Sequence, residues 1–286
     1  MDNKSILKKN KEALFICGTP IGNLGDVSFR LLDTLKQVDM ILAEDTRTIR
    51  KLLSRYDIKK SQIISYHQHS TAKKLDFIIE ELKNGKTAAL VSESGMPSIQ
   101  DPGYRIIGQC IEEGIAITVI PGPNAATSAL VLSGLPVDNF LFIGFLPKSG
   151  EKRKAKITEV SGLPYTLIFY ESPNRIEKLL GELIQKLGDR RSALVREMTK
   201  IYEEAIRGNL SEVLENIRSR TRVKGEIVLV VEGSRGELIA EYTEDEIKAK
   251  LMDLISQGIS KKNAQKIIRS RYDIDRQKLY NISTKI

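Results

Sequence analysis

Four loops of this sequence place charged side chains directly after a run of apolar residues. The longest, residues 91–103, holds Glu93 and Asp101 together with two glycines and two prolines, and a loop of this length between a strand and a helix indicates that it surrounds a ligand. The others are residues 44–47, 169–175 and 196–204. Carboxylates in such places can perform acid–base chemistry and arginines can hold phosphate, although charge runs more often form solvated surfaces.

Histidines and cysteines do not support a metal or nucleophile site. His67 and His69 are the only histidines, and zinc would need a third protein ligand that no cysteine is placed to supply. We therefore favour structural or polar-contact roles for both histidines and expect no metal. The sequence also lacks a G-x-S-x-G elbow, and neither Cys17 nor Cys110 has a basic neighbour in sequence that would favour a thiolate.

Glycine-rich loops form a second group of candidate ligand-binding segments. Residues 18–26 contain Gly18, Gly22 and Gly25 after a short apolar run. This spacing is not G-x-G-x-x-G, and no G-x-x-x-x-G-K-[ST] occurs, so a standard dinucleotide or P-loop site is not expected. For this loop alone, a tight turn without a ligand and a close approach of backbone to a ligand are equally good interpretations.

Apolar runs and amphipathic stretches alternate over the first 120 residues. The runs predict strands over residues 14–17, 40–43, 63–66, 88–92 and 117–120, and helical spacing fills residues 28–37, 46–55, 72–83 and 103–113. This alternation predicts a parallel sheet with helices on its faces. Ligands bind beyond the carboxyl ends of such strands, where the loops of this half lie.

The second half is expected to contain a mixed sheet. After Pro-Gly-Pro-Asn at residues 121–124, Asn124 is a suitable cap for a helix over residues 125–133. Strands are expected over residues 140–145, 165–170, 192–197, 202–207 and 226–232. Residues 198–201 are too short for a crossover helix, so antiparallel pairs must occur. We expect residues 148–156 to form a basic surface loop and residues 243–286 to be helical.

The length of 286 residues allows several domains. We expect an N-terminal α/β domain over residues 1–121, a second α/β domain over residues 122–236 and a basic helical domain over residues 237–286. The net charge of +8 favours a polyanionic partner, and much of the excess lies in the helical tail. Neither a secretory signal nor a membrane-spanning run is found, which predicts a cytoplasmic protein.

Nine motifs, taken in order, resemble those of one protein family. They are residues 18–26, 43–47, 66–69, 91–103, 121–125, 144–147, 169–175, 196–204 and 224–226. Together they resemble the ribosomal RNA small subunit methyltransferase I family, a branch of the tetrapyrrole methylases. The resemblance extends over residues 12–235, and the tail is similar to the small C-terminal domain of many members.

The resemblance implies an enzyme that uses S-adenosylmethionine to methylate the ribose 2′-hydroxyl of a cytidine in the decoding region of 16S ribosomal RNA. It implies two α/β domains with the cofactor in the cleft between them, a homodimer, and 16S ribosomal RNA or the small ribosomal subunit as partner. The residues that it assigns to cofactor binding lie in three loops: Gly18, Pro20, Gly22, Asn23, Ser92, Gly95, Pro97, Pro121, Gly122, Pro123 and Ala125.

Three motifs depart from the family pattern. The usual Ser-Asp-Ala-Gly-Thr-Pro is here Ser-Glu-Ser-Gly-Met-Pro, so Glu93 lengthens the carboxylate side chain and Met96 lacks a hydroxyl. Asn124 stands in place of a serine and Asn174 in place of a histidine. Roles that depend on the replaced side chains are therefore open. The glycine and proline that shape the backbone of Ser-Glu-Ser-Gly-Met-Pro, Gly95 and Pro97, are kept.

Methyl transfer to a ribose hydroxyl depends on positioning and benefits from a base. No histidine lies in a matched catalytic loop, so the candidates are Glu93, Asp101 and Glu171, with no choice among them. The cations expected to contact RNA are Arg47, Arg175, Arg196, Lys200, Lys261, Lys262, Lys266 and Arg269. Two alternatives remain: a corrin or porphyrin methyltransferase of the same superfamily, and a non-catalytic RNA-binding factor of ribosome assembly.

Overall fold

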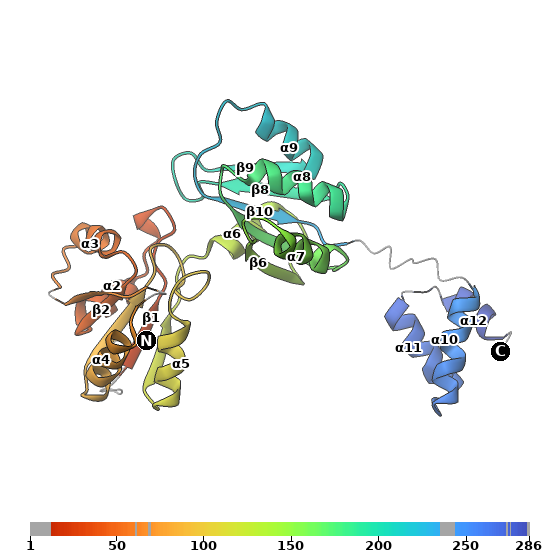
Figure 1. The fold of residues 1–286 in the computed structure, drawn as a ribbon, viewed down its shortest axis with the longest axis horizontal. Coiled ribbons are helices and arrows are strands. Elements are labelled where there is room, and N and C mark those ends of the chain that lie inside the picture. Colours follow the sequence, from red (N-terminus) through yellow and green to blue (C-terminus); the bar gives the residue numbers. More distant parts are fainter. Residues whose placement is uncertain are drawn as a thin grey trace.

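Two five-stranded sheets and a group of C-terminal helices form the fold in this computed structural model (Figure 1). The structure describes residues 13–60, 62–67, 70–234, 244–272, 274 and 276–284. His69 lies outside these residues. None of the helices in the described ranges has the length and apolar character that crossing a bilayer requires.

The first sheet is entirely parallel, as predicted. Its strands are β1 (Ala13–Cys17), β2 (Met40–Ala43), β3 (Ile63–Ser65), β4 (Thr87–Val91) and β5 (Ala116–Ile120). They lie in the order β3-β2-β4-β1-β5, and every neighbouring pair is parallel. Because parallel strands end at the same edge, the loops after these strands are brought together there.

Helices cover both faces of this sheet. α2 (Phe29–Gln37) and α3 (Thr46–Arg55) pack against one set of alternating strand side chains, which includes Phe15. α4 (Ala72–Lys83) and α5 (Tyr104–Glu112) pack against the other set. Successive residues of a strand point to opposite faces, so the continuous apolar runs of the sequence supply both layers.

The second sheet is mixed. Its strands are β6 (Phe140–Phe145), β7 (Thr166–Glu171), β8 (Arg191–Arg196), β9 (Glu204–Asn209) and β10 (Ile227–Val231), in the order β6-β7-β10-β8-β9. β6 and β7 are parallel, whereas the other three pairs are antiparallel. The short connection between β8 and β9 thus joins an antiparallel pair, as its length predicted.

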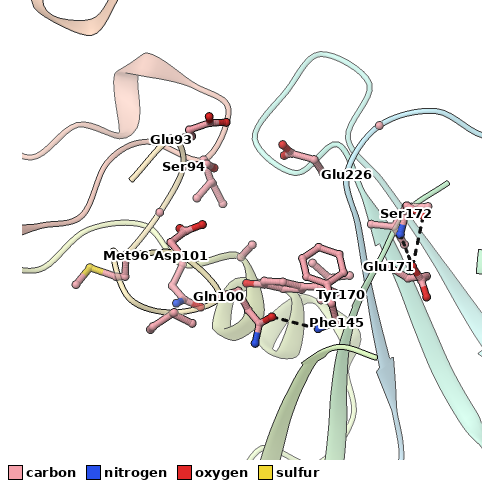
Figure 2. A pocket seen from close by; sticks show the side chains of 18 of the residues that line it. Glu93, Ser94, Met96, Gln100, Asp101, Phe145, Tyr170, Glu171, Ser172 and Glu226 are labelled. Carbon is pink, nitrogen blue, oxygen red and sulfur yellow. Dashed lines mark hydrogen bonds between the residues drawn. The ribbon is translucent and has the colours of Figure 1, made fainter. Parts of the chain in front are cut away.

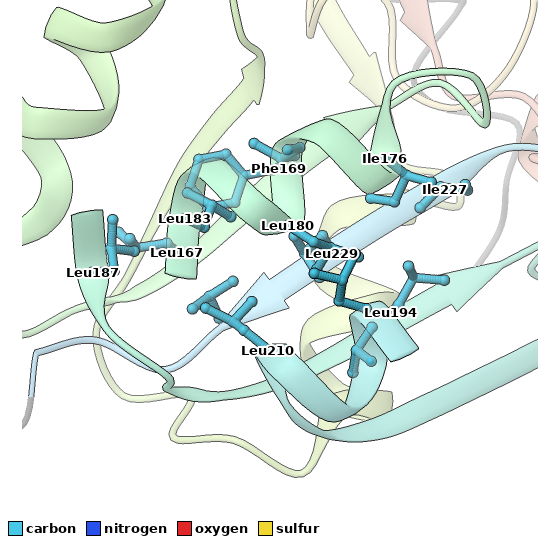
Figure 3. Close-up of a cluster of buried hydrophobic side chains, with 14 of the residues drawn as sticks. Leu167, Phe169, Ile176, Leu180, Leu183, Leu187, Leu194, Leu210, Ile227 and Leu229 are labelled. Carbon is cyan, nitrogen blue, oxygen red and sulfur yellow. The ribbon is translucent and has the colours of Figure 1, made fainter. Parts of the chain in front are cut away.

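The helices of the second half divide between the two faces of this sheet. α8 (Ile176–Leu187) and α9 (Leu210–Arg218) cover one face, where Phe169 and Leu229 lie in a fully apolar core (Figure 3). α6 (Ala125–Ser133) covers the opposite face. The expected boundary between residues 121 and 122 falls in the loop between β5 and α6, and the division into domains stays a prediction.

Residues 148–156 do not form the expected surface loop. α7 (Glu151–Ser161) begins within this segment. Its Arg153 is only 2% exposed and forms ion pairs with Glu171, at 3.4 Å, and with Glu182, at 2.6 Å. The prediction was wrong because it treated every cation of the segment as solvated, whereas this arginine is buried between two carboxylates.

Three helices follow the second sheet: α10 (Glu244–Ser256), α11 (Lys261–Tyr272) and α12 (Arg276–Ser283). They share a small apolar core of their own, which includes Leu251 and Ile268. The helical prediction for the tail is therefore confirmed over its described residues, which include a turn at Gly258 with φ +85°. The expected boundary at residues 236 and 237 lies outside the described part of the chain.

Candidate active site

A cavity of about 390 Å³ opens between loops of the two sheets (Figure 2). Residues 93–96, 99–101 and 124–125 line it from one side, and residues 170–173 and 225–228 line it from the other. Figure 2 shows Asp101 and Tyr170 on facing walls. Apolar and aromatic walls with a few polar groups are typical of a site for a small molecule.

The glycine-rich loop after β1 lies against two other loops that were assigned to cofactor binding. A Cβ on Gly18 would lie 2.7 Å from the backbone of Gly122, so these two backbones are in contact. Thr19 N donates to Gly95 O at 2.9 Å, and Gly95 N donates to Thr19 O at 3.2 Å. At Gly18 the absence of a side chain therefore serves the close approach of two protein segments.

The predicted cofactor residues take up different positions around the cavity. Gly95 and Ala125 line it. Asn23 N donates to Thr199 Oγ1 at 3.0 Å, and a Cβ on Gly22 would meet the side chain of Lys200, so both residues contact the loop after β8. The remaining residues belong to the three loops without lining the cavity: Gly18, Pro20, Ser92, Pro97, Pro121, Gly122 and Pro123. The assignment of the set to cofactor binding stays a prediction.

Asp101 has the electrostatic surroundings of a general base. Burial, followed by the charges of Glu44 and Glu93, raises the pKa of its carboxyl to about 6, against the opposing effect of a hydrogen bond with Ser92. Such a carboxylate is ionised at neutral pH yet binds a proton more readily than an ordinary aspartate. Burial and the charge of Glu93 also raise the pKa of Glu44.

The other two carboxylate candidates have different surroundings. Glu93 is exposed where it lines the cavity. The Glu171 side chain is completely buried, with Arg175 Nη2 at 2.7 Å and Arg153 Nη1 at 3.4 Å from its oxygens. It also accepts a hydrogen bond from Ser172 N at 2.8 Å (Figure 2). Its carboxylate is therefore engaged by two guanidinium groups and the backbone.

Comparison with known proteins identifies the family. A family profile described as Tetrapyrrole (Corrin/Porphyrin) Methylases matches residues 13–214. A relative from Halalkalibacterium halodurans, named Ribosomal RNA small subunit methyltransferase I, is 42% identical over 96% of both chains. The chain belongs to the ribosomal RNA small subunit methyltransferase I family. It is therefore a methyltransferase.

Other relatives carry the same name. The Bacillus subtilis protein is 40% identical over 96% of this chain and 94% of its own length. The Thermotoga maritima protein is 42% identical over 77% of this chain and 98% of its own length. A family member can therefore lack a counterpart of about a quarter of this chain.

Solved structures of low sequence identity establish the tetrapyrrole methylase fold. A cobalt precorrin-4 methyltransferase has a TM-score of 0.57 at 18% identity, covering 77% of this chain and 95% of that one. A uroporphyrin-III C-methyltransferase from Thermus thermophilus, complexed with S-adenosyl homocysteine, has a TM-score of 0.52 at 17% identity, covering 77% and 97%. The use of S-adenosylmethionine expected for this methyltransferase is consistent with that complex.

The loop cations that the family motifs supply are engaged in ion pairs. The pairs are Arg47–Asp45, Arg175–Glu171, Arg196–Glu204 and Lys200–Glu197. By contrast, the described part of the chain shows no ion pair for four exposed cations of α11, which are Lys261, Lys262, Lys266 and Arg269. The role of all eight cations in RNA binding stays a prediction. The charges of the loop cations are partly neutralised by their acidic partners, whereas no such partner is described for the four tail cations.

Sequence reasoning did not single out Gln100, which connects the loop after β4 to the second sheet. Its Oε1 accepts a hydrogen bond from Phe145 N at 3.5 Å (Figure 2). Its side-chain amide would clash with a Cβ on Gly144, in a strand whose register shifts at that point. Gln100 itself has φ +67°, a conformation that costs free energy. These contacts hold Gln100, the neighbour of Asp101 in sequence, against the second sheet.

If Asp101 is the general base, replacing Gln100 by alanine is expected to lower the rate of methyl transfer about tenfold, because the Asp101 carboxylate is then positioned less well. The acidic limb of the pH–rate profile should also move to lower pH, because a more hydrated Asp101 has a lower pKa. Ser98→Ala is the matched control: Ser98 shares the loop and a positive φ, and its buried hydroxyl has no hydrogen-bond partner among the described residues. An unchanged profile in Gln100→Ala would contradict this role.

Proposed function

We propose that this chain uses S-adenosylmethionine to methylate the ribose 2′-hydroxyl of a cytidine in the decoding region of 16S ribosomal RNA. The observation that carries the proposal is the 40–42% identity over 96% of the chain to proteins named as methyltransferases of small-subunit ribosomal RNA. The ribose position and the cytidine come from the family resemblance of the nine motifs. The free RNA or the assembled small subunit is the substrate.

The cavity suits the proposed cofactor. Phe145 and Tyr170 form an edge-to-face aromatic pair with ring centroids 5.5 Å apart, and both line the cavity. Apolar and aromatic surface of this kind accepts an adenosyl group. The carboxylates of Glu93, Asp101 and Glu226 supply negative charge near the cavity, which favours a positively charged sulfonium.

We assign the general base to Asp101. When bound, the cofactor supplies an electrophilic methyl group, and the C–S bonding electrons return to sulfur. The carboxylate of Asp101 would accept the proton of the ribose 2′-hydroxyl while the ribose 2′-oxygen bonds to the methyl carbon. Asp101 then loses the proton to solvent, so charge and atoms balance. Glu44 and Glu93 assist by raising the pKa of this carboxyl.

The proposed enzyme acts in the cytoplasm, as the sequence pattern predicts, and as a homodimer, an expectation that rests on the family resemblance. Its C-terminal helices supply RNA affinity that does not depend on sequence. The exposed cations of α11, which form no ion pair within the described residues, support this role. Recognition of the nucleotide is then left to the shape of the folded RNA.

A chain that ends at Ser234 is expected to bind small subunits about tenfold or more weakly, because it loses the phosphate contacts of the tail. Binding of S-adenosylmethionine should be unchanged, since none of the described tail residues lines the cavity. Calorimetry with the cofactor and filter binding with subunits measure the two affinities. Equal subunit affinity in the full and shortened chains would refute the role of the tail.

Methyl transfer from labelled cofactor tests the substrate class. The proposal expects label in 16S ribosomal RNA or in small subunits that lack the modification, and none in a corrin or porphyrin. Transfer to a tetrapyrrole alone would favour a corrin or porphyrin methyltransferase. Binding of RNA without any transfer would favour the non-catalytic assembly factor.

A further inference from the structure

One helix of the first half carries an exposed face on which every charged residue is a cation. Along α3, Arg47, Arg50, Lys51 and Arg55 are all exposed, and no acidic residue interrupts them. Helical geometry places residues three, four and eight apart on one face. The opposite face holds the apolar residues that pack on the sheet, so the cationic face points to solvent.

The charges of this face are largely unneutralised. Arg47 pairs with Asp45, but the described part of the chain shows no salt bridge for Arg50, Lys51 or Arg55. Some cations of other surface helices do have acidic partners: Lys178 of α8 pairs with Glu182, and Lys83 of α4 pairs with Glu113. Like charges three and four residues apart lower the stability of a helix. The row therefore does not stabilise the fold, and binding of an external anion is a better explanation for its presence.

The helix is firmly held, and it begins beside the active site. Asp45 caps α3 by accepting a hydrogen bond from Arg47 N, directly after Glu44. The hydrogen bond and charge of Asp45, together with the charge of Glu93, raise the pKa of Arg47. Glu93 itself lines the cavity. At the other end, Tyr56 Oη donates to Leu24 O at 2.6 Å.

We propose that the cationic face of α3 binds the phosphate backbone of the RNA substrate next to the target nucleotide. Residues 47, 51 and 55 lie about 6 Å apart along the axis, from a rise of about 1.5 Å per residue. The row leads away from the carboxyl edge of the sheet, where Asp101 and Glu93 lie. The proposal rests on the proposed function, since RNA is the polyanion concerned.

The test compares two triple variants of the full chain with equal loss of charge. Arg50→Gln/Lys51→Gln/Arg55→Gln removes the unpaired cations of α3. Lys73→Gln/Lys152→Gln/Lys186→Gln removes exposed cations of α4, α7 and α8 and is the control. We expect the α3 variant to raise the KM for 16S RNA about tenfold or more and to lower the salt slope of binding by about 2 to 3, with the rate at saturating RNA retained. The control should change both far less.

The outcomes separate this proposal from the proposed function. If the parent chain methylates RNA and the two variants have the same KM and salt slope, the α3 proposal is wrong and the function stands. If the α3 variant is impaired on assembled subunits but normal on naked 16S RNA, the face meets a ribosomal protein, which also overturns the proposal. If the parent chain transfers no methyl group to RNA, the proposed function itself fails.

Discussion

Replacing Asp101 by asparagine is expected to lower the rate of methyl transfer about 100- to 10,000-fold, the usual contribution of a general base. Asparagine keeps the size and much of the polarity of the side chain but cannot accept the proton. Affinity for S-adenosylmethionine should fall far less than the rate. Single-turnover methyl transfer and calorimetry measure the two effects separately.

The pH dependence of the rate identifies the general base more specifically than the loss of rate does. With a pKa of about 6 for Asp101, the parent activity should fall as pH drops through 6, because the base becomes protonated. Asp101→Asn should lack this limb. Glu44→Gln should move the limb to lower pH, because the Glu44 charge raises the pKa of Asp101. If the acidic limb of the pH–rate profile is unchanged in both variants, another residue is the general base.

Stability should change in the opposite direction to activity. Asp101 has a folded-state pKa raised from 3.8 to about 6, so the folded chain binds this proton more tightly than the unfolded chain. The resulting stability is present at low pH and is lost as pH rises through 6. Asp101→Asn should therefore unfold at a higher temperature than the parent chain above pH 6, with a smaller difference below pH 4. Thermal unfolding at the two pH values tests the sign.

Replacing Arg153 by methionine is expected to lower the free energy of unfolding by about 3 kcal/mol or more, the cost of leaving a buried charge short of a partner. Arg153 is 2% exposed, and it holds the fully buried Glu171 and the partly buried Glu182. It also donates to Pro147 O at 3.1 Å. Urea unfolding of the parent and the variant measures the change.

Lys154→Met on the same helix is the control. Lys154 pairs with Glu151 at 3.0 Å, but both side chains are exposed, so its loss should cost no more than about 1 kcal/mol. The double variant Arg153→Met/Glu171→Gln should recover part of the stability, because it removes the carboxylate left without its buried partner. A loss for Arg153→Met no larger than that of the control would contradict a structural role for the buried pair.

The parallel sheet was predictable because each of its strands is a short apolar run followed by polar or glycine-rich residues. Residues 40–43, for example, are buried in every position of β2, so no alternation obscures the run. The antiparallel pairing of β8 and β9 followed from the length of their connection alone. Both inferences depend on local pattern, which a sequence displays directly.

The roles of individual charges were not predictable in the same way. Arg153 and Arg50 are both cations on helices, yet one is buried against Glu171 and the other faces solvent without a salt bridge. Which cation finds a carboxylate depends on contacts between segments far apart in the chain. For the same reason, the three carboxylate candidates could be distinguished only when burial and neighbours were known. Gln100 was missed because the residues it contacts, Gly144 and Phe145, lie in the other sheet.

The position of the transferred methyl group tests the central proposal most directly. Small subunits that lack the modification are incubated with the chain and labelled S-adenosylmethionine, and their 16S RNA is then hydrolysed with alkali. A methyl group on the ribose 2′-oxygen blocks cleavage of the adjacent phosphodiester. We expect the label in one alkali-resistant dinucleotide that begins with cytidine from the decoding region. With Asp101→Asn, this dinucleotide should be nearly unlabelled. Label released as an ordinary mononucleotide methylated on its base would contradict it.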